Sequence, residues 1–109
     1  MLQVKKIDVS NFSNNSLQNM NWMFGQCYEI KELNFSNFNN NHNFLYNLCG
    51  IFINCIGLKK LNIYKFNTNN VIDMRSMFNC CRSLKQLNLS NFNTLNVRKM
   101  DSMLQSMYL

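Results

Sequence analysis

Five cysteines and one histidine are the residues of this 109-residue chain that could act as nucleophiles or metal ligands. His42 lies close to Cys49, and an imidazole that activates a thiolate would make a covalent catalyst. Such a catalyst also needs a group that orients the imidazole and donors that stabilise an oxyanion, and neither pattern is present here. A zinc site is not indicated, because no two cysteines have the C-x-x-C spacing. With five Asp and Glu residues in all, we expect no catalytic, metal-binding or cofactor-binding residues, and no enzyme.

The chain consists of four related segments. A shift of 26 residues superimposes Leu61 on Leu87 and Met74 on Met100. A fixed period between about 20 and 50 residues is typical of stacked repeat proteins, in which each unit buries its apolar face against its neighbours. Within a single domain at 1–109, we place the repeats at about 4–29, 30–57, 58–83 and 84–109.

Each repeat carries two apolar patterns of different period. The alternation L-x-L, which begins at Leu87 in the fourth repeat, predicts a short strand with alternate residues facing the core. Between Val71 and Cys81 apolar residues follow at i, i+3, i+6, i+7 and i+10, which predicts one face of a helix. Thr68 and Thr94 precede this pattern and are expected to be N-caps. We therefore predict an α/β solenoid of about four strand–turn–helix repeats, with a short parallel sheet on its concave face.

Three of the cysteines share one repeat position. Cys27, Cys55 and Cys81 follow a phenylalanine in equivalent places, and a small thiol in such a column is expected to fill the core. Cys49 and Cys80 lie outside the column. For these two, a chance disulfide and a surface thiol both remain open.

The residues L-K-Q-L-N-L-S-N-F-N-T of the fourth repeat and M-R-S-M-F-N-C-C of the third resemble the BspA-like leucine-rich repeat of bacterial, mollicute and protist surface proteins. The resemblance covers nearly the whole chain, although the second repeat has Leu48 and Ile51 where the pattern has methionine. It implies a leucine-rich-repeat-like solenoid at the cell surface or outside the cell. It also implies adhesion or binding to a host or extracellular-matrix protein, with no catalytic residue and no cofactor.

The two ends of the chain depart from a complete array of this kind. We see no polar capping unit, which solenoids normally carry, and no secretory signal peptide in Met1 to Ser10. No apolar run approaches the roughly 20 residues that span a membrane. We therefore expect a fragment of a longer surface protein or an uncapped array.

Outward-facing strand residues are the expected ligand-binding surface, because stacked repeats usually bind on the face their strands present. Tyr64 interrupts a column of serines, and an exposed aromatic side chain is a common anchor at interfaces. A column of asparagines could recognise a ligand, or it could only satisfy neighbouring side chains as a polar ladder. The candidate ligand-binding residues are Tyr64, Asn34, Asn62, Asn88, Lys31, Lys59, Lys60 and Lys85.

Two alternatives to ligand binding on the strands follow from charge and from the chain ends. The net charge of +6 and the repeated lysines would suit a polyanion such as nucleic acid. This is less favoured, because a lysine at a fixed repeat position is explained by the repeat itself. The other alternative is self-assembly by end-to-end stacking, since Met103, Leu104 and Met107 are expected to leave an apolar face at the last repeat.

Overall fold

A computed structural model describes residues 6–9, 18–38 and 45–108 of the chain. His42, which was considered as a partner of Cys49 and not favoured, lies outside these residues, as do Met1 to Lys5 and Ser10. Three short strands are present: β1 (Lys6–Asp8), β2 (Glu32–Asn34) and β3 (Lys60–Asn62).

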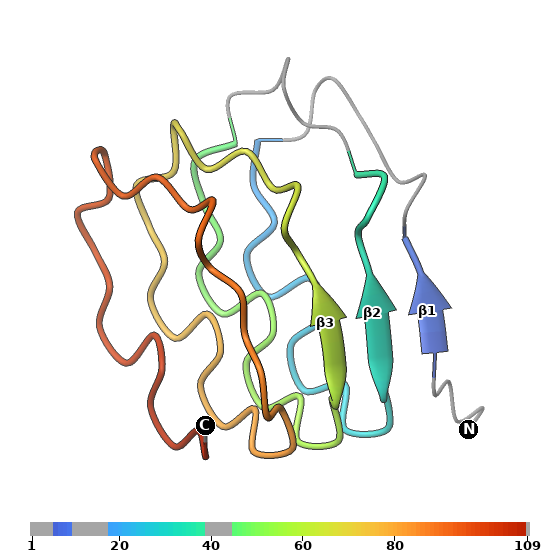
Figure 1. Ribbon diagram of the computed structural model, residues 1–109. Helices are drawn as coiled ribbons and strands as arrows, with labels where there is room; N and C mark the ends of the chain where they lie inside the picture. The colour runs from blue at the N-terminus through green and yellow to red at the C-terminus, as the bar shows by residue number, and fades with distance from the viewer. Residues whose placement is uncertain (1–5, 10–17, 39–44, 109) are drawn as a thin grey trace.

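The three strands form one parallel sheet in the order β1-β2-β3 (Figure 1). The register places Ile7 beside Leu33 and Leu33 beside Leu61, so equivalent residues of successive repeats are neighbours. Leu33 is buried, whereas Glu32 and Asn34 on either side of it are half-buried. In β2 the alternation of the sequence therefore directs one side chain into the core and two onto the outer face of the sheet, which we call the strand face.

The described residues contain no helix, so the predicted α/β solenoid of strand–turn–helix repeats is wrong. Four-residue turns follow one another where helices were expected. In the second repeat the N–H group of Ile51 donates to the carbonyl of Leu48 at 3.2 Å, and that of Cys55 to Phe52 at 3.1 Å. The third residue of each turn has a positive φ, 62° at Gly50 and 59° at Asn54, as a type II turn requires.

The physical reason for the error is that two kinds of backbone produce the same spacing. A helix directs residues i, i+3, i+4 and i+7 to one side. Two consecutive four-residue turns whose first and fourth residues point inward give the same positions. In the second repeat these positions are all buried, and they are occupied by Leu48, Ile51, Phe52 and Cys55.

The expected N-caps have a different role, since neither begins a helix. Thr68 is buried, and its Oγ1 accepts a hydrogen bond from the N–H group of Asn93 at 2.8 Å. Its hydroxyl also lies 3.3 Å from the Asn93 carbonyl, to which it donates. Thr68 therefore joins the third repeat to the fourth.

A second ladder joins the repeats on the side away from the sheet. Its turn segments, residues 19–27, 47–55, 73–81 and 99–107, run side by side (Figure 1) and begin at parallel bridges from Asn19 to Asn47, Asn47 to Asp73 and Asp73 to Lys99. In each turn segment but the last, alternate N–H groups donate to carbonyls of the next repeat. In the second repeat the donors Leu48, Gly50, Phe52 and Asn54 bind the carbonyls of Asp73, Arg75, Met77 and Asn79 at 2.8–3.1 Å. We call this arrangement the turn ladder.

The core lies between the sheet and the turn ladder. A column of rings runs through it: Phe24 stacks on Phe52 at 6.1 Å and Phe52 on Phe78 at 5.7 Å between centroids. Beside this column the thiol of Cys55 donates to the carbonyl of Phe24 and that of Cys81 to Phe52, both at 3.1 Å. Cys55 and Cys81 are fully buried, as predicted. Cys27, the equivalent cysteine of the first repeat, is half-buried.

The fourth repeat joins the turn ladder but not the sheet. Lys99 pairs with Asp73, and Leu84 is fully buried. Residues 85–90, which carry the fourth L-x-L pattern, form no strand, and the described sheet ends at β3.

Candidate interaction surface

The asparagine column closes a turn at the ends of β2 and β3 and at the equivalent place in the fourth repeat. The Oδ1 atoms of Asn34, Asn62 and Asn88 each accept a hydrogen bond from the backbone N–H group two residues further on. Such Asx turns are a common way to leave a strand. The Oδ1 atoms of this column therefore bind the backbone of their own repeat, and Oδ1 of Asn88 also accepts a hydrogen bond from the hydroxyl of Ser90 at 2.7 Å. The three donors are Ser36, Tyr64 and Ser90, at 2.9, 3.2 and 3.0 Å.

Tyr64 stands on the strand face with its backbone held from two sides. Its N–H group donates to Asn62, and its carbonyl accepts from Nδ2 of Asn91 at 3.1 Å. The residue is 47% exposed. It lies at a hollow of about 390 Å³ that is lined by Ser36, Leu61, Asn62, Ile63, Tyr64, Lys65 and Asn88.

Two further hollows continue this surface across the strands. One of about 330 Å³ lies over β2 and β3 and includes Asn34, Lys60 and Asn62. The other, of about 240 Å³, is lined by Lys59, Lys60, Leu61, Gln86 and Asn88. The structure thus brings together Tyr64, the three asparagines, Lys59 and Lys60.

The lysines among the candidate ligand-binding residues are not all part of this surface. The Nζ atom of Lys60 lies 3.6 Å from Oε1 of Glu32, and since the lysine side chain is 79% exposed this pair adds little stability. Lys31 is half-buried and turns its ammonium group toward the connection between repeats, where a Cβ at Gly57 would lie 2.8 Å from Nζ. Lys85 is exposed. Neither Lys31 nor Lys85 lines any of the three hollows.

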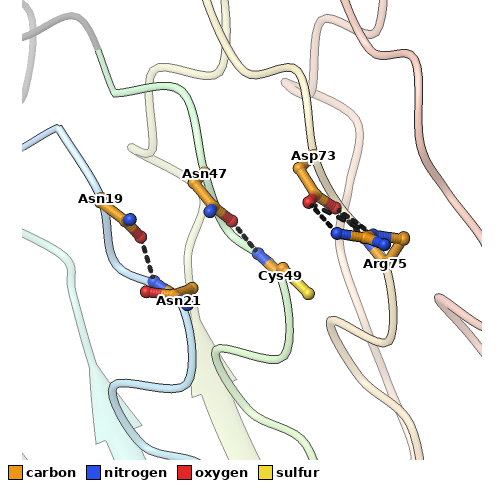
Figure 2. A network of polar contacts seen from close by, with 6 residues as sticks. All are labelled: Asn19, Asn21, Asn47, Cys49, Asp73 and Arg75. Atoms are coloured by element: carbon orange, nitrogen blue, oxygen red, sulfur yellow. Dashed lines mark hydrogen bonds and ion pairs between the residues drawn. The ribbon is translucent and has the colours of Figure 1, made fainter.

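A second column of Asx turns, which the sequence reasoning missed, begins the turn ladder (Figure 2). Asn19, Asn47 and Asp73 occupy equivalent positions, and each Oδ1 accepts the backbone N–H group two residues on. A signal was present, because Asn or Asp recurs at this position in three repeats; the fourth has Lys99. The donors are Asn21, Cys49 and Arg75, at 2.8, 2.9 and 3.0 Å.

Asp73 differs from the two asparagines because it also binds a guanidinium. Nε of Arg75 lies 3.0 Å from Oδ1, and its Nη2 lies 2.7 Å from Oδ2. The hydrogen bond from the Arg75 side chain is the main cause that lowers the pKa of Asp73 below its ordinary value, against the opposing effect of burial. A carboxylate with a lowered pKa and both oxygens engaged is suited to holding a turn and is a poor general base.

The model of one protein family matches residues 18–108, most of the chain and all four turn segments. The chain belongs to the family "Mycoplasma protein of unknown function, DUF285". This DUF285 chain matches no curated protein and no solved structure. The expected relationship to mollicute proteins is therefore confirmed at the level of the family. The description of the family states no function.

The remaining chemistry of the DUF285 chain is limited. Burial and the neighbouring Asp73 raise the pKa of the Cys49 thiol, an effect that outweighs the opposing one of Arg75, so this thiol is not activated. All five cysteines are free thiols. Within 6–9, 18–38 and 45–108, no three His, Cys, Asp or Glu side chains gather as a metal site would need. Within the same ranges no helix is long and apolar enough to cross a membrane.

Proposed function

We propose that this chain is a non-catalytic protein-interaction module that binds its ligand on the strand face around Tyr64. One observation carries the proposal: the Tyr64 ring is half-exposed beside the largest of the three hollows, on a backbone that two hydrogen bonds fix. With its backbone already held and only two side-chain torsions left to order, Tyr64 loses little conformational entropy on binding.

The surroundings of Tyr64 suggest what the ligand carries. Lys59, Lys60 and Lys65 flank the hollows, and the chain has a net charge of +6. Asn62 and Ser36 add polar groups to the lining of the hollow beside Tyr64. The ligand that fits is a protein segment with acidic side chains and one apolar or aromatic side chain that packs on Tyr64.

The sequence motif suggests the type of repeat and the place where the protein acts. The repeats are of the BspA-like leucine-rich type, and the protein acts in adhesion at the cell surface. The motif L-K-x-L-x-L-S-N-F-N-T and the membership of a mycoplasma family support this assignment. The sheet of parallel strands with an outward polar face is compatible with it.

Selection of peptides from a random display library tests the proposal and requires no candidate ligand. We expect the selected peptides to combine acidic and aromatic residues and to lose more than about tenfold in affinity for Tyr64→Ala. The matched control is Tyr46→Ala, since Tyr46 is 41% exposed but belongs to the turn ladder, where its backbone binds Gln18. Peptides that bind wild type and Tyr64→Ala equally, or that lose affinity only for Tyr46→Ala, would place the binding surface elsewhere.

A further inference from the structure

The turn ladder ends in two different backbone edges. Twelve hydrogen bonds, four at each of the three junctions between repeats, run from an N–H group of the earlier repeat to a carbonyl of the later one. In the first repeat, the carbonyls equivalent to the acceptors receive no hydrogen bond from any described residue. These are the carbonyls of Asn19, Asn21, Met23 and Gly25.

The fourth repeat presents the opposite set of groups. Its N–H groups equivalent to the donors make no backbone hydrogen bond within the described ranges. They belong to Met100, Ser102, Leu104 and Ser106. One edge of the molecule therefore offers a row of acceptors and the other a row of donors with the same spacing.

The side chains at both edges are apolar and incompletely covered. Met100 is 46% and Leu104 48% exposed, although their counterparts in the third repeat, Met74 and Phe78, are fully buried. At the other edge Met23 is 39% exposed. Each of these side chains would be buried if one more repeat lay beside it.

The sheet shows the same lack of a neighbour at the fourth repeat. Val9 donates to the carbonyl of Asn34 and Phe35 to that of Asn62, at 3.1 and 3.0 Å. Among the described residues, the N–H group of Ile63 does not make the corresponding hydrogen bond to the carbonyl of Asn88. Residues 85–90 therefore lie outside the sheet although the preceding turn segment is in place.

We propose that the edge of the fourth repeat binds the first-repeat edge of a second copy of this chain, head to tail. The contact would continue the junction that the chain already forms three times, with the same donors, acceptors and apolar columns. A second copy carries the acceptor edge by construction, so no other partner is needed to explain the match. Because the two surfaces differ, a pair of copies still has one free edge of each kind, and further copies can add by the same contact.

Charge opposes this contact, which gives it a distinctive salt dependence. Each copy carries a net charge of +6, and salt screens the repulsion between copies. Raising the NaCl concentration from about 50 mM to about 500 mM should therefore strengthen the association. A polyanion held by the lysines would dissociate under the same change.

The test is light scattering on a sizing column over a hundredfold range of protein concentration, with variants at each edge. We expect the mass of the wild type to rise with concentration and with salt. Leu104→Lys should be monomeric and so should Met23→Lys, because each loses one edge. Ile56→Lys is the matched control: Ile56 is 40% exposed but lies on an internal repeat, so this variant should associate like the wild type.

An equimolar mixture of the two edge variants decides the direction of the contact. Leu104→Lys keeps the acceptor edge and Met23→Lys keeps the donor edge, so the mixture should contain a species of two chains and nothing larger. A wild type that stays monomeric throughout would overturn the proposal. A Met23→Lys protein that still dimerises alone would also overturn it, since that result means the fourth-repeat edges pair with each other.

Discussion

Oδ1 of Asp73 accepts two hydrogen bonds from Arg75, one from its backbone N–H group and one from Nε, both at 3.0 Å. One carboxylate thus closes the turn and holds the side chain that follows it. Asn19 and Asn47 make the first of these bonds and have no arginine two residues on. The turn is therefore common to the first three repeats, and the ion pair is specific to the third.

Substitutions of Asp73 should separate the turn from the ion pair. Asp73→Asn keeps an Oδ1 acceptor, as in the first two repeats, and should cost well under about 1 kcal/mol because the Arg75 side chain is 42% exposed. Asp73→Ala also leaves the N–H group of Arg75 without its acceptor and should cost about 1–2 kcal/mol. Urea denaturation at neutral pH measures both values. Equal losses would mean that the turn does not depend on this oxygen.

The stability that Asp73 contributes should disappear in acid. Its pKa is lowered in the folded protein from an ordinary value of 3.8, chiefly by the hydrogen bond from the Arg75 side chain. The contribution is therefore present above about pH 4 and is lost as the pH falls through the folded-state pKa. We expect the difference in unfolding free energy between wild type and Asp73→Asn to shrink toward zero between about pH 5 and about pH 2. Other carboxylates cancel in this comparison, so a difference that stays constant with pH would contradict the assignment.

Gly50→Ala should destabilise the protein by more than about 1 kcal/mol. Gly50 has a φ of 62°, and a Cβ there would lie 2.9 Å from Nε1 of Trp22. The reverse change, Asn54→Gly, places glycine at a φ of 59° and should be neutral or slightly stabilising. Trp22 is the single tryptophan, so its fluorescence follows unfolding and also reports any shift of the indole in Gly50→Ala. Equal stability of the two variants would show that the left-handed backbone imposes no glycine preference here.

The phenylalanine column should be far more sensitive to truncation inside the stack than at its end. Phe78→Ala removes a fully buried ring that stacks on Phe52 and should cost about 3–5 kcal/mol. Leu104→Ala changes the next member of the column, which is 48% exposed, and should cost less than about 1 kcal/mol at low protein concentration. Thermal unfolding of both variants measures the contrast. Similar losses would mean that the fourth repeat is as tightly packed as the third.

Thiol labelling should distinguish the buried cysteines from the others. Burial raises the pKa of both Cys55 and Cys81 to about 12, so these thiols should stay unlabelled by an aromatic disulfide reagent at about pH 8 until the protein unfolds. At most three of the five cysteines should react in the native state, and all five in denaturant. The raised pKa values also predict that stability is present below about pH 9 and declines as the pH rises toward 12. Five rapidly reacting thiols in the native protein would exclude the buried column.

The apolar columns of the core could be predicted from the sequence, but the backbone conformation that carries them could not. Leu61 and Leu33 are neighbours in the sheet, as the repeat register implies, because side chains one repeat apart must share a face. The turn segments could not be recognised, since Leu48, Ile51, Phe52 and Cys55 have helical spacing in a backbone of successive turns.

The conformation of individual residues in these turns was also beyond prediction. Only Gly50 is a glycine among the described residues with a positive φ; Trp22, Gln26 and Cys80 adopt the same conformation. Hydrogen bonds to the neighbouring repeat hold them there, so tertiary context overrides local preference. At the strand face, Tyr64 could be singled out as an exposed aromatic, whereas the Asx turn that fixes it required the structure.

The twelve hydrogen bonds of the turn ladder all run in the same direction, from the earlier repeat to the later one, and so give the ladder a net dipole. Each peptide group carries a dipole, and aligned peptide dipoles add, as they do along an α-helix. Here the aligned bonds run across the repeats, from the N–H group of one to the carbonyl of the next. A partial negative charge therefore collects at the carbonyls of Asn19 to Gly25, and a partial positive charge at the N–H groups of Met100 to Ser106. The turn ladder is therefore a weak dipole that lies across the repeats.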